Sequence, residues 1–345
     1  MSKERIGLVL GLFFFVLAAF VLPLDMPPAG RYTLGITLLM ATWWVTEALP
    51  LPITALLPLV MFPVFGVLPI DKAAAGYSDR IIYLFLGGFM LAIAIERWNL
   101  HRRIALAIIT RIGGSLGGLV WGFILATGVL SMWISNTATA LMMLPIGMAV
   151  MSQLQCVENE EIARESTAFG KALLLGIAYA SSIGGIATLV GTPTNMVFVG
   201  YAEKNYPDMP VDFATWLWFA LPPTLLMLVL CWWYIAKIGY PLRARLTPEV
   251  RQTLADERDK LGAWSYEEKL VAIIFGCVAA GWILRGFVVD ALKSPALTKE
   301  TLQYLADCFP YFGDLSKKTD YRFYCYGIDL RGISDTTLAL VGAML

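Results

Sequence analysis

The sequence is poor in charged residues. Asp, Glu, Lys and Arg make up 15% of its 345 residues, whereas soluble domains average about 25%. Hydrophobic residues make up 58% of the chain. This composition predicts a protein that crosses a membrane several times. The formal net charge is zero and no basic stripe is present, which argues against a nucleic-acid partner.

Histidine and cysteine are also scarce. His101 is the single histidine, and the five cysteines show no C-x-x-C spacing. The sequence therefore lacks the pattern of a zinc site or of a disulfide framework. An intramembrane enzyme would need a nucleophile paired with a base, but no predicted span contains histidine and no lysine is placed to face Ser135. We expect neither an enzyme nor a bound cofactor.

Long apolar runs recur along the chain. The predicted spans cover residues 6–24, 32–48, 51–65, 81–95, 171–200, 216–235 and 270–289. Most are near the ~20 apolar residues that cross a bilayer, and the shorter ones are expected to tilt. With the N-terminus in the cytoplasm, the arginines after the fourth and sixth of these spans are cytoplasmic, as the positive-inside rule requires. The sequence thus predicts an all-α polytopic membrane protein.

Four arginines follow the fourth span beside an apolar face: Arg97, Arg102, Arg103 and Arg111. One interpretation is a helix lying along the cytoplasmic interface, with its cations meeting lipid headgroups. The alternative is a cytoplasmic extension of the fourth span.

A polar cluster interrupts the apolar segment 117–151. It contains Ser131, Ser135, Asn136, Thr137 and Thr139. Each flank is about 14 residues long, a helical rise of ~21 Å against a hydrocarbon core of ~30 Å. Neither flank is expected to cross the membrane alone. The pattern predicts a re-entrant hairpin with its tip at residues 131–137.

A second interruption lies at Gly191-Thr192-Pro193. Proline favours a break, and Thr192 is suited to cap a new helix with Pro193 at its first position. Broken backbone inside a bilayer is tolerated only where protein or a polar cavity satisfies it. Two breaks at similar depth are typical of the midplane site of a secondary transporter. The alternative is two independent kinks.

The hairpin offers oxygen ligands but no cationic side chain. Residues 117–157 contain no Lys or Arg, so an anion bound there requires cations to arrive with it. The oxygens of Ser131, Ser135 and Asn136 are hard ligands suited to Na⁺. We expect this cluster to hold a sodium ion and a substrate together.

Four stretches carry a family resemblance, and together they span most of residues 30–200. They are WWVTEALPLPITALLPLVMFP (43–63), FLGGFMLAIAIERWNLHRRIAL (85–106), SNTATALMMLPI (135–146) and GGIATLVGTPTN (184–195). In this order they resemble the divalent anion/sodium symporter family. The resemblance implies a bacterial-type inner-membrane transporter for dicarboxylates, citrate or sulfate. It also implies a homodimer, an inverted-repeat fold and an elevator-type motion of a transport domain past a scaffold.

The resemblance also assigns site residues. Ser131, Ser135, Asn136 and Gly191 would form a sodium site. Substrate carboxylates would lie near a set that shares part of it: Ser135, Asn136, Thr137, Thr192 and Pro193.

The chain departs from the family pattern at two points. Thr194 stands where members usually have a second proline, and the chain contains one Ser-Asn-Thr motif where the family has two. We therefore expect mainly the first repeat of a longer transporter. The predicted parts are scaffold spans plus an interfacial helix (1–113), a transport hairpin and broken span (114–200), two spans with a basic linker (201–289), and an outer polar segment leading into a next span (290–345).

The leading hypothesis is sodium-coupled symport of small divalent anions, most of all the C4-dicarboxylates succinate, malate and fumarate. Citrate or sulfate symport and sodium-independent exchange or export by the same architecture remain alternatives. A membrane scaffold that transports nothing is a third class, and it predicts that Ser135→Ala and Asn136→Ala affect stability alone.

Overall fold

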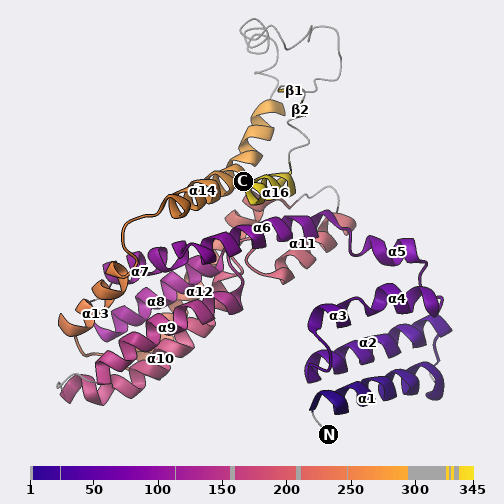
Figure 1. The fold of residues 1–345 in the computed structure, drawn as a ribbon, viewed down its shortest axis with the longest axis horizontal. Coiled ribbons are helices and arrows are strands. Elements are labelled where there is room, and N and C mark those ends of the chain that lie inside the picture. The colour runs from indigo at the N-terminus through magenta and orange to yellow at the C-terminus, as the bar shows by residue number, and fades with distance from the viewer. Residues whose placement is uncertain are drawn as a thin grey trace, which may run out of the picture. The chain divides into compact units, whose positions relative to one another are not determined.

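The computed structural model describes residues 3–23, 25–112, 114–155, 160–206, 211–246, 248–293, 324–325, 328–329 and 334–345. The described chain is helical almost throughout, and its strands are the short antiparallel pair β1 (Tyr324–Cys325) and β2 (Ile328–Asp329) (Figure 1). Among the described residues, four helices are long and apolar enough to cross a membrane by length and composition, or five if the bent pair 81–97 and 100–112 is one span. The predicted all-α polytopic class is confirmed. The chain divides into two compact units, residues 1–82 and 83–345.

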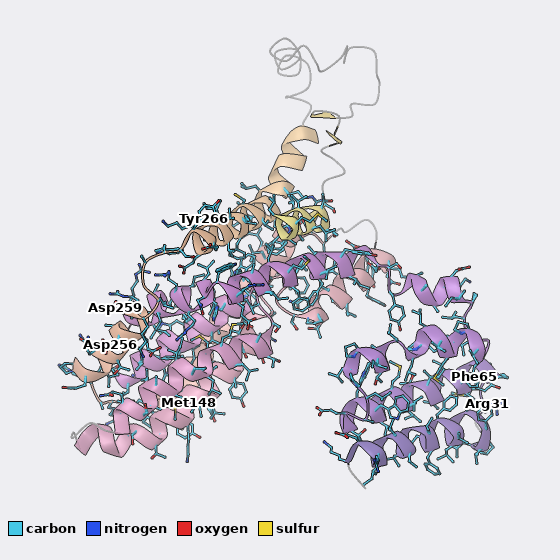
Figure 2. All side chains as sticks on the ribbon, viewed as in Figure 1. Arg31, Phe65, Met148, Asp256, Asp259 and Tyr266 are labelled. Atoms are coloured by element: carbon cyan, nitrogen blue, oxygen red, sulfur yellow. The ribbon has the colours of Figure 1, made fainter. Side chains whose placement is uncertain are left out.

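The first unit is a small stack of helices. It contains α1 (Lys3–Val16) with a π-helical continuation η1 (Leu17–Val21), α2 (Pro28–Thr46), α3 (Leu51–Ala55), α4 (Leu57–Val64) and α5 (Ile70–Ala75). Pro28 begins α2 at a position where a missing N–H is harmless. Phe65, labelled in Figure 2, has ring contacts with Phe15 and Tyr32, at centroid separations of 5.3 and 5.2 Å.

The predicted span 51–65 is broken into α3 and α4. Pro58 at the start of α4 has no N–H, so it cannot continue the hydrogen-bond ladder of α3. The Tyr77 hydroxyl donates to the carbonyl of Ala55 at 2.7 Å, and so satisfies one group beside the break.

The second unit holds the remaining helices. They are α6 (Arg80–Arg97), α7 (Leu100–Ile112), α8 (Leu116–Ser131), α9 (Asn136–Gln155), α10 (Glu160–Gly184), α11 (Pro193–Asn205), α12 (Phe213–Trp233), η2 (Tyr234–Gly239), α13 (Pro248–Asp259), α14 (Tyr266–Lys293) and α16 (Asp335–Met344). Apolar side chains of α7 to α10 form one continuous core, with Phe123 and Phe169 completely buried. The predicted polar segment 290–345 lies mostly outside the described residues, and α16 forms the apolar run expected after Asp335.

Helix α7 is a separate helix, bent by 71° from α6. Asn99 makes the corner with a left-handed backbone, φ +57°. Two arginines of α7 form ion pairs, Arg102 with Glu257 at 3.1 Å and Arg103 with Glu268 at 2.5 Å. These two cations contact carboxylates on α13 and α14, whereas the interfacial-helix interpretation has them meeting lipid headgroups.

Helices α8 and α9 form the predicted hairpin around α10. Gly176 and Gly184 of α10 face Ile124 and then Gly128 of α8, so these two helices run in the same direction. Gly170 faces Met151 of α9, and α10 reaches Asn136 only at its far end, so α9 runs the opposite way. The three helices lie side by side in Figure 1.

The predicted length of the hairpin arms is wrong. Helix α8 has 16 residues and α9 has 20, because α9 continues through Pro145 and the polar residues up to Gln155. Twenty residues rise about 30 Å, which is enough to cross a bilayer. Leu141 and Met148, one heptad apart on α9, are both more than half exposed (Met148 is labelled in Figure 2), as a lipid-facing side would be.

The second break is longer than predicted. Helix α10 ends at Gly184 and α11 begins at Pro193, so residues 185–192 are all non-helical. The break begins where α10 meets α8 most closely, since a Cβ at Gly184 would overlap the carbonyl oxygen of Gly128. Such close approach through glycine is typical of helix pairs that pack in membranes.

Candidate functional site

The first break lies between α8 and α9. Its backbone is closed locally, since the N–H groups of Met132 and Ile134 donate to Gly128 and Leu130 at 3.2 and 3.0 Å. Ser135 precedes α9, and its Oγ accepts the N–H of Ala138 at 3.4 Å. Ser135 therefore acts as the N-cap of α9, a role that the sequence analysis did not assign to it.

A buried cluster of oxygen atoms lies beside this break. The Oγ of Ser131 is 2.8 Å from Oδ1 of Asn136 and 2.6 Å from the carbonyl oxygen of Ser181. A serine hydroxyl has one hydrogen, and both neighbours in this arrangement are acceptors. The Ser131 hydroxyl is completely buried and can donate to only one of the two oxygens, and the Ser181 carbonyl also accepts the N–H of Gly185 at 3.2 Å. A bound cation would balance these electron-rich oxygens. Hard metal ions prefer ligand sets made only of oxygen atoms.

The two breaks meet at Gly185. The Asn136 side chain lies directly against this glycine, and a Cβ at position 185 would overlap its Oδ1. Gly191 in turn packs on the backbone of Gly185. The structure thus brings together three of the four predicted sodium ligands, Ser131, Asn136 and Gly191. The fourth, Ser135, lies next to Asn136 in the sequence and caps α9.

Side chains satisfy the carbonyls of the second break. Asn195 is buried and its Nδ2 donates to the carbonyls of Gly185 and Thr188, at 2.9 and 2.8 Å. The indole N–H of Trp216 on α12 donates to the carbonyl of Ile186 at 3.0 Å. Buried backbone groups require such partners.

Thr188 joins this break to the first one. Its hydroxyl donates to the carbonyl of Met132 and accepts the N–H of Gly191. The sequence analysis did not single out Thr188 or Asn195. Both stand in the 184–195 motif, and the available signal was two hydrogen-bonding side chains within a run of small residues.

The predicted substrate residues begin α9 and α11. Asn136 and Thr137 begin α9, Thr192 is the N-cap of α11, and Pro193 is its first residue, as predicted. Thr137 and Pro193 are exposed, whereas Asn136 and Thr192 are half-buried. One part of the prediction is wrong. The Thr192 side chain makes no capping hydrogen bond, and its Oγ1 lies 3.4 Å from Oγ1 of Thr194. Among the described residues no hydrogen bond joins Thr137 to Thr192.

The parts of the sequence on either side of the two breaks contain no charged residue. Residues 116–157 and 172–202 lack Asp, Glu, Lys and Arg altogether. The N-termini of α9 and α11 contribute partial positive charges of about half an elementary charge each. The described residues also contain no group of three His, Cys, Asp or Glu that could hold a metal ion. The arrangement suits a hard monovalent cation and an anion that brings its own counter-ion.

Comparison with known proteins identifies relatives. A family model described as the sodium:sulfate symporter transmembrane region matches residues 2–306. The sodium-dependent dicarboxylate transporter SdcS of Staphylococcus saprophyticus is 41% identical over 288 residues, which is 83% of this chain and 55% of that protein. The SdcS of Staphylococcus aureus strain USA300 is 40% identical over 290 residues, 84% of this chain and 56% of that protein. The chain spans about half the length of the curated relatives it matches.

Proposed function

Because the chain belongs to the sodium:sulfate symporter family, we propose that the protein carries small divalent anions across a membrane together with sodium ions. The predicted resemblance to divalent anion/sodium symporters is confirmed, and the chain is a multi-pass membrane protein. Relatives named sodium-dependent dicarboxylate transporters support C4-dicarboxylates such as succinate, malate and fumarate as substrates.

One observation carries the sodium part of the proposal. The Ser131 hydroxyl lies between two acceptor oxygens and can donate to only one of them. A sodium ion held by Ser131, Asn136, the neighbouring Ser135 and the backbone of Gly191 would balance these oxygens. The competing arrangement turns the Asn136 amide so that its NH₂ group donates to Ser131, which satisfies the cluster without an ion.

The substrate part follows from charge. An unpaired ion inside a low-dielectric site costs several kcal/mol, and a dianion has two negative charges. The starts of α9 and α11 offer Ser135, Asn136, Thr137, Thr192 and Pro193, none of them cationic. Helix N-termini favour a carboxylate by about 0.3–1 kcal/mol each, or ~2 kcal/mol when partly buried. Bound sodium has to supply the rest, and so the two solutes move together.

The wider proposal extends to the whole protein. It comprises a homodimer in a bacterial-type inner membrane, a cytoplasmic N-terminus, no enzymatic activity and an elevator-type motion. The predicted parts remain a scaffold of residues 1–113, a transport region of residues 114–200 and two further segments, 201–289 and 290–345. The dimer contacts and the lipid-facing surfaces are part of this proposal.

Uptake in liposomes tests the coupling. The full-length protein should accumulate labelled succinate under an inward sodium gradient, and lithium should replace sodium poorly. Uptake that ignores sodium would contradict the coupling and favour an anion exchanger or exporter. Failure of any anion to cross, with correctly folded protein, would favour the scaffold interpretation.

Sulfate is a second candidate substrate, because the matching family model is described by sulfate. Competition of labelled succinate uptake by unlabelled malate, citrate and sulfate distinguishes the substrates. We expect malate to compete strongly and sulfate weakly.

A further inference from the structure

We propose that Thr188 is a positioning residue for the sodium site. Its hydroxyl couples the α8–α9 turn to residue Gly191, and so fixes the ligands of one break relative to those of the other. This inference rests on the proposed function, since it concerns the geometry of the same sodium site.

The hydrogen-bond directions at Thr188 are fixed by chemistry. A carbonyl can only accept and a backbone N–H can only donate, so the hydroxyl donates to Met132 and accepts from Gly191. The Oγ1 to Gly191 N distance is 3.1 Å. Thr188 is completely buried, so water does not replace the bond to Met132 if the hydroxyl is removed, whereas the Gly191 N–H keeps the Thr188 carbonyl as an acceptor at 3.3 Å.

The two partners of Thr188 adjoin the sodium ligands. Met132 directly follows Ser131 and belongs to the turn that leads to Asn136. Gly191 is itself a proposed ligand through its backbone. One hydroxyl therefore connects the two halves of the site, across 56 residues of sequence between Met132 and Thr188.

Asn195 links the backbone of Thr188 to that of Gly185. Asn195 donates to the Thr188 carbonyl at 2.8 Å and to the Gly185 carbonyl at 2.9 Å. Gly185 lies against the Asn136 side chain. A displacement at Thr188 is thus transmitted to Met132, Gly191 and Asn136 together, and a change in sodium affinity should follow.

The test compares three variants of the full-length protein. Thr188→Val keeps the shape of the side chain and removes both hydrogen bonds, whereas Thr188→Ser keeps the hydroxyl. Thr127→Val is the matched control, since Thr127 is equally buried on α8 but its hydroxyl donates only to Phe123 in its own helix, at 2.7 Å. Two quantities are measured. The first is the melting temperature in sodium compared with that in choline, and the second is the sodium dependence of succinate uptake.

We expect Thr188→Val to raise the half-saturating sodium concentration about tenfold, because of the two bonds only the one to Met132 is lost without a replacement. Thr188→Ser should restore the wild-type value to within about threefold, and Thr127→Val should leave it unchanged. A Thr188→Val protein that responds to sodium like the wild type would overturn the proposal, even if its melting temperature falls.

Two further outcomes are distinguishable. If Thr188→Val does not fold, Thr188→Cys replaces it, because a thiol is a weak donor with longer bonds. An unchanged sodium dependence in the cysteine variant overturns the positioning role. A wild-type protein that does not respond to sodium overturns the proposed function itself, whatever Thr188 does.

Discussion

Replacing Ser131 with alanine tests whether this serine is a sodium ligand or serves only the stability of the fold. Ser131 is completely buried and its hydroxyl serves Asn136 and the Ser181 carbonyl, at 2.8 and 2.6 Å. Its removal takes the donor from one of these oxygens, which costs about 1–3 kcal/mol when the oxygen is buried. If sodium uses the same oxygen, that loss appears in sodium binding as a rise of about ten- to hundredfold in the half-saturating concentration.

The matched control lies in the same cluster. Ser181→Ala removes a buried hydroxyl that bonds only to Ala178 in its own helix, and it keeps the carbonyl that Ser131 contacts. Both variants should lower the melting temperature, but only Ser131→Ala should change the sodium dependence of stability and of succinate uptake. Equal sodium dependence in the two variants would refute the assignment of Ser131 as a ligand. It would favour the arrangement in which the Asn136 amide satisfies the cluster.

Two other predictions concern packing and ion pairs. Gly184→Ala should destabilise the protein by about 1–3 kcal/mol, because its methyl group would meet the Gly128 backbone, whereas Gly276→Ala, with open space around it, should be neutral or stabilising in the same thermal assay. Arg103→Ala should cost about 3–5 kcal/mol, because it leaves the carboxylate of its buried ion pair without its partner. Arg258→Ala, at an exposed pair, should cost less than about 1 kcal/mol, and similar losses for the two arginine variants would contradict the role of burial.

The sequence was sufficient to predict the presence of both breaks. Glycine, proline and hydroxyl residues disfavour continuous helix inside a bilayer, and their positions 131–137 and 191–193 fall within or beside the breaks. The location of Pro193 at the first turn of α11 followed from its fixed φ and missing N–H. The site residues near Gly185 were predictable in part for the same reason.

The extent of the breaks was not predictable from local pattern. Helix α9 continues through Pro145 to Gln155, beyond the end of the apolar run. A fall in hydrophobicity therefore did not mark the end of this helix. The early end of α10 coincides with its close approach to Gly128, which lies 56 positions before Gly184. Hydropathy describes each residue alone, whereas these bounds depend on the neighbouring helix.

Partner identity was likewise hidden. The hydroxyl of Thr188 donates to the carbonyl of Met132, and Arg103 pairs with Glu268, which lies 165 residues further along the chain. Small polar or basic residues in an apolar sequence indicate that hydrogen-bond or ion-pair partners are needed. The sequence alone does not predict which residues these partners are. The Thr192 hydroxyl illustrates the converse: its position as N-cap was predictable, but its bond was not.

The lack of ionised side chains along residues 116–157 and 172–202 has a consequence for leakage. A vacant pocket is electrically neutral, and so is one that holds a dianion with two monovalent cations. Any partially filled pocket carries a net charge, and moving it through hydrocarbon costs several kcal/mol more. Under the proposed mechanism, the cost of desolvation alone therefore disfavours movement of a partially occupied site. No separate gating element is needed to prevent this uncoupled transport.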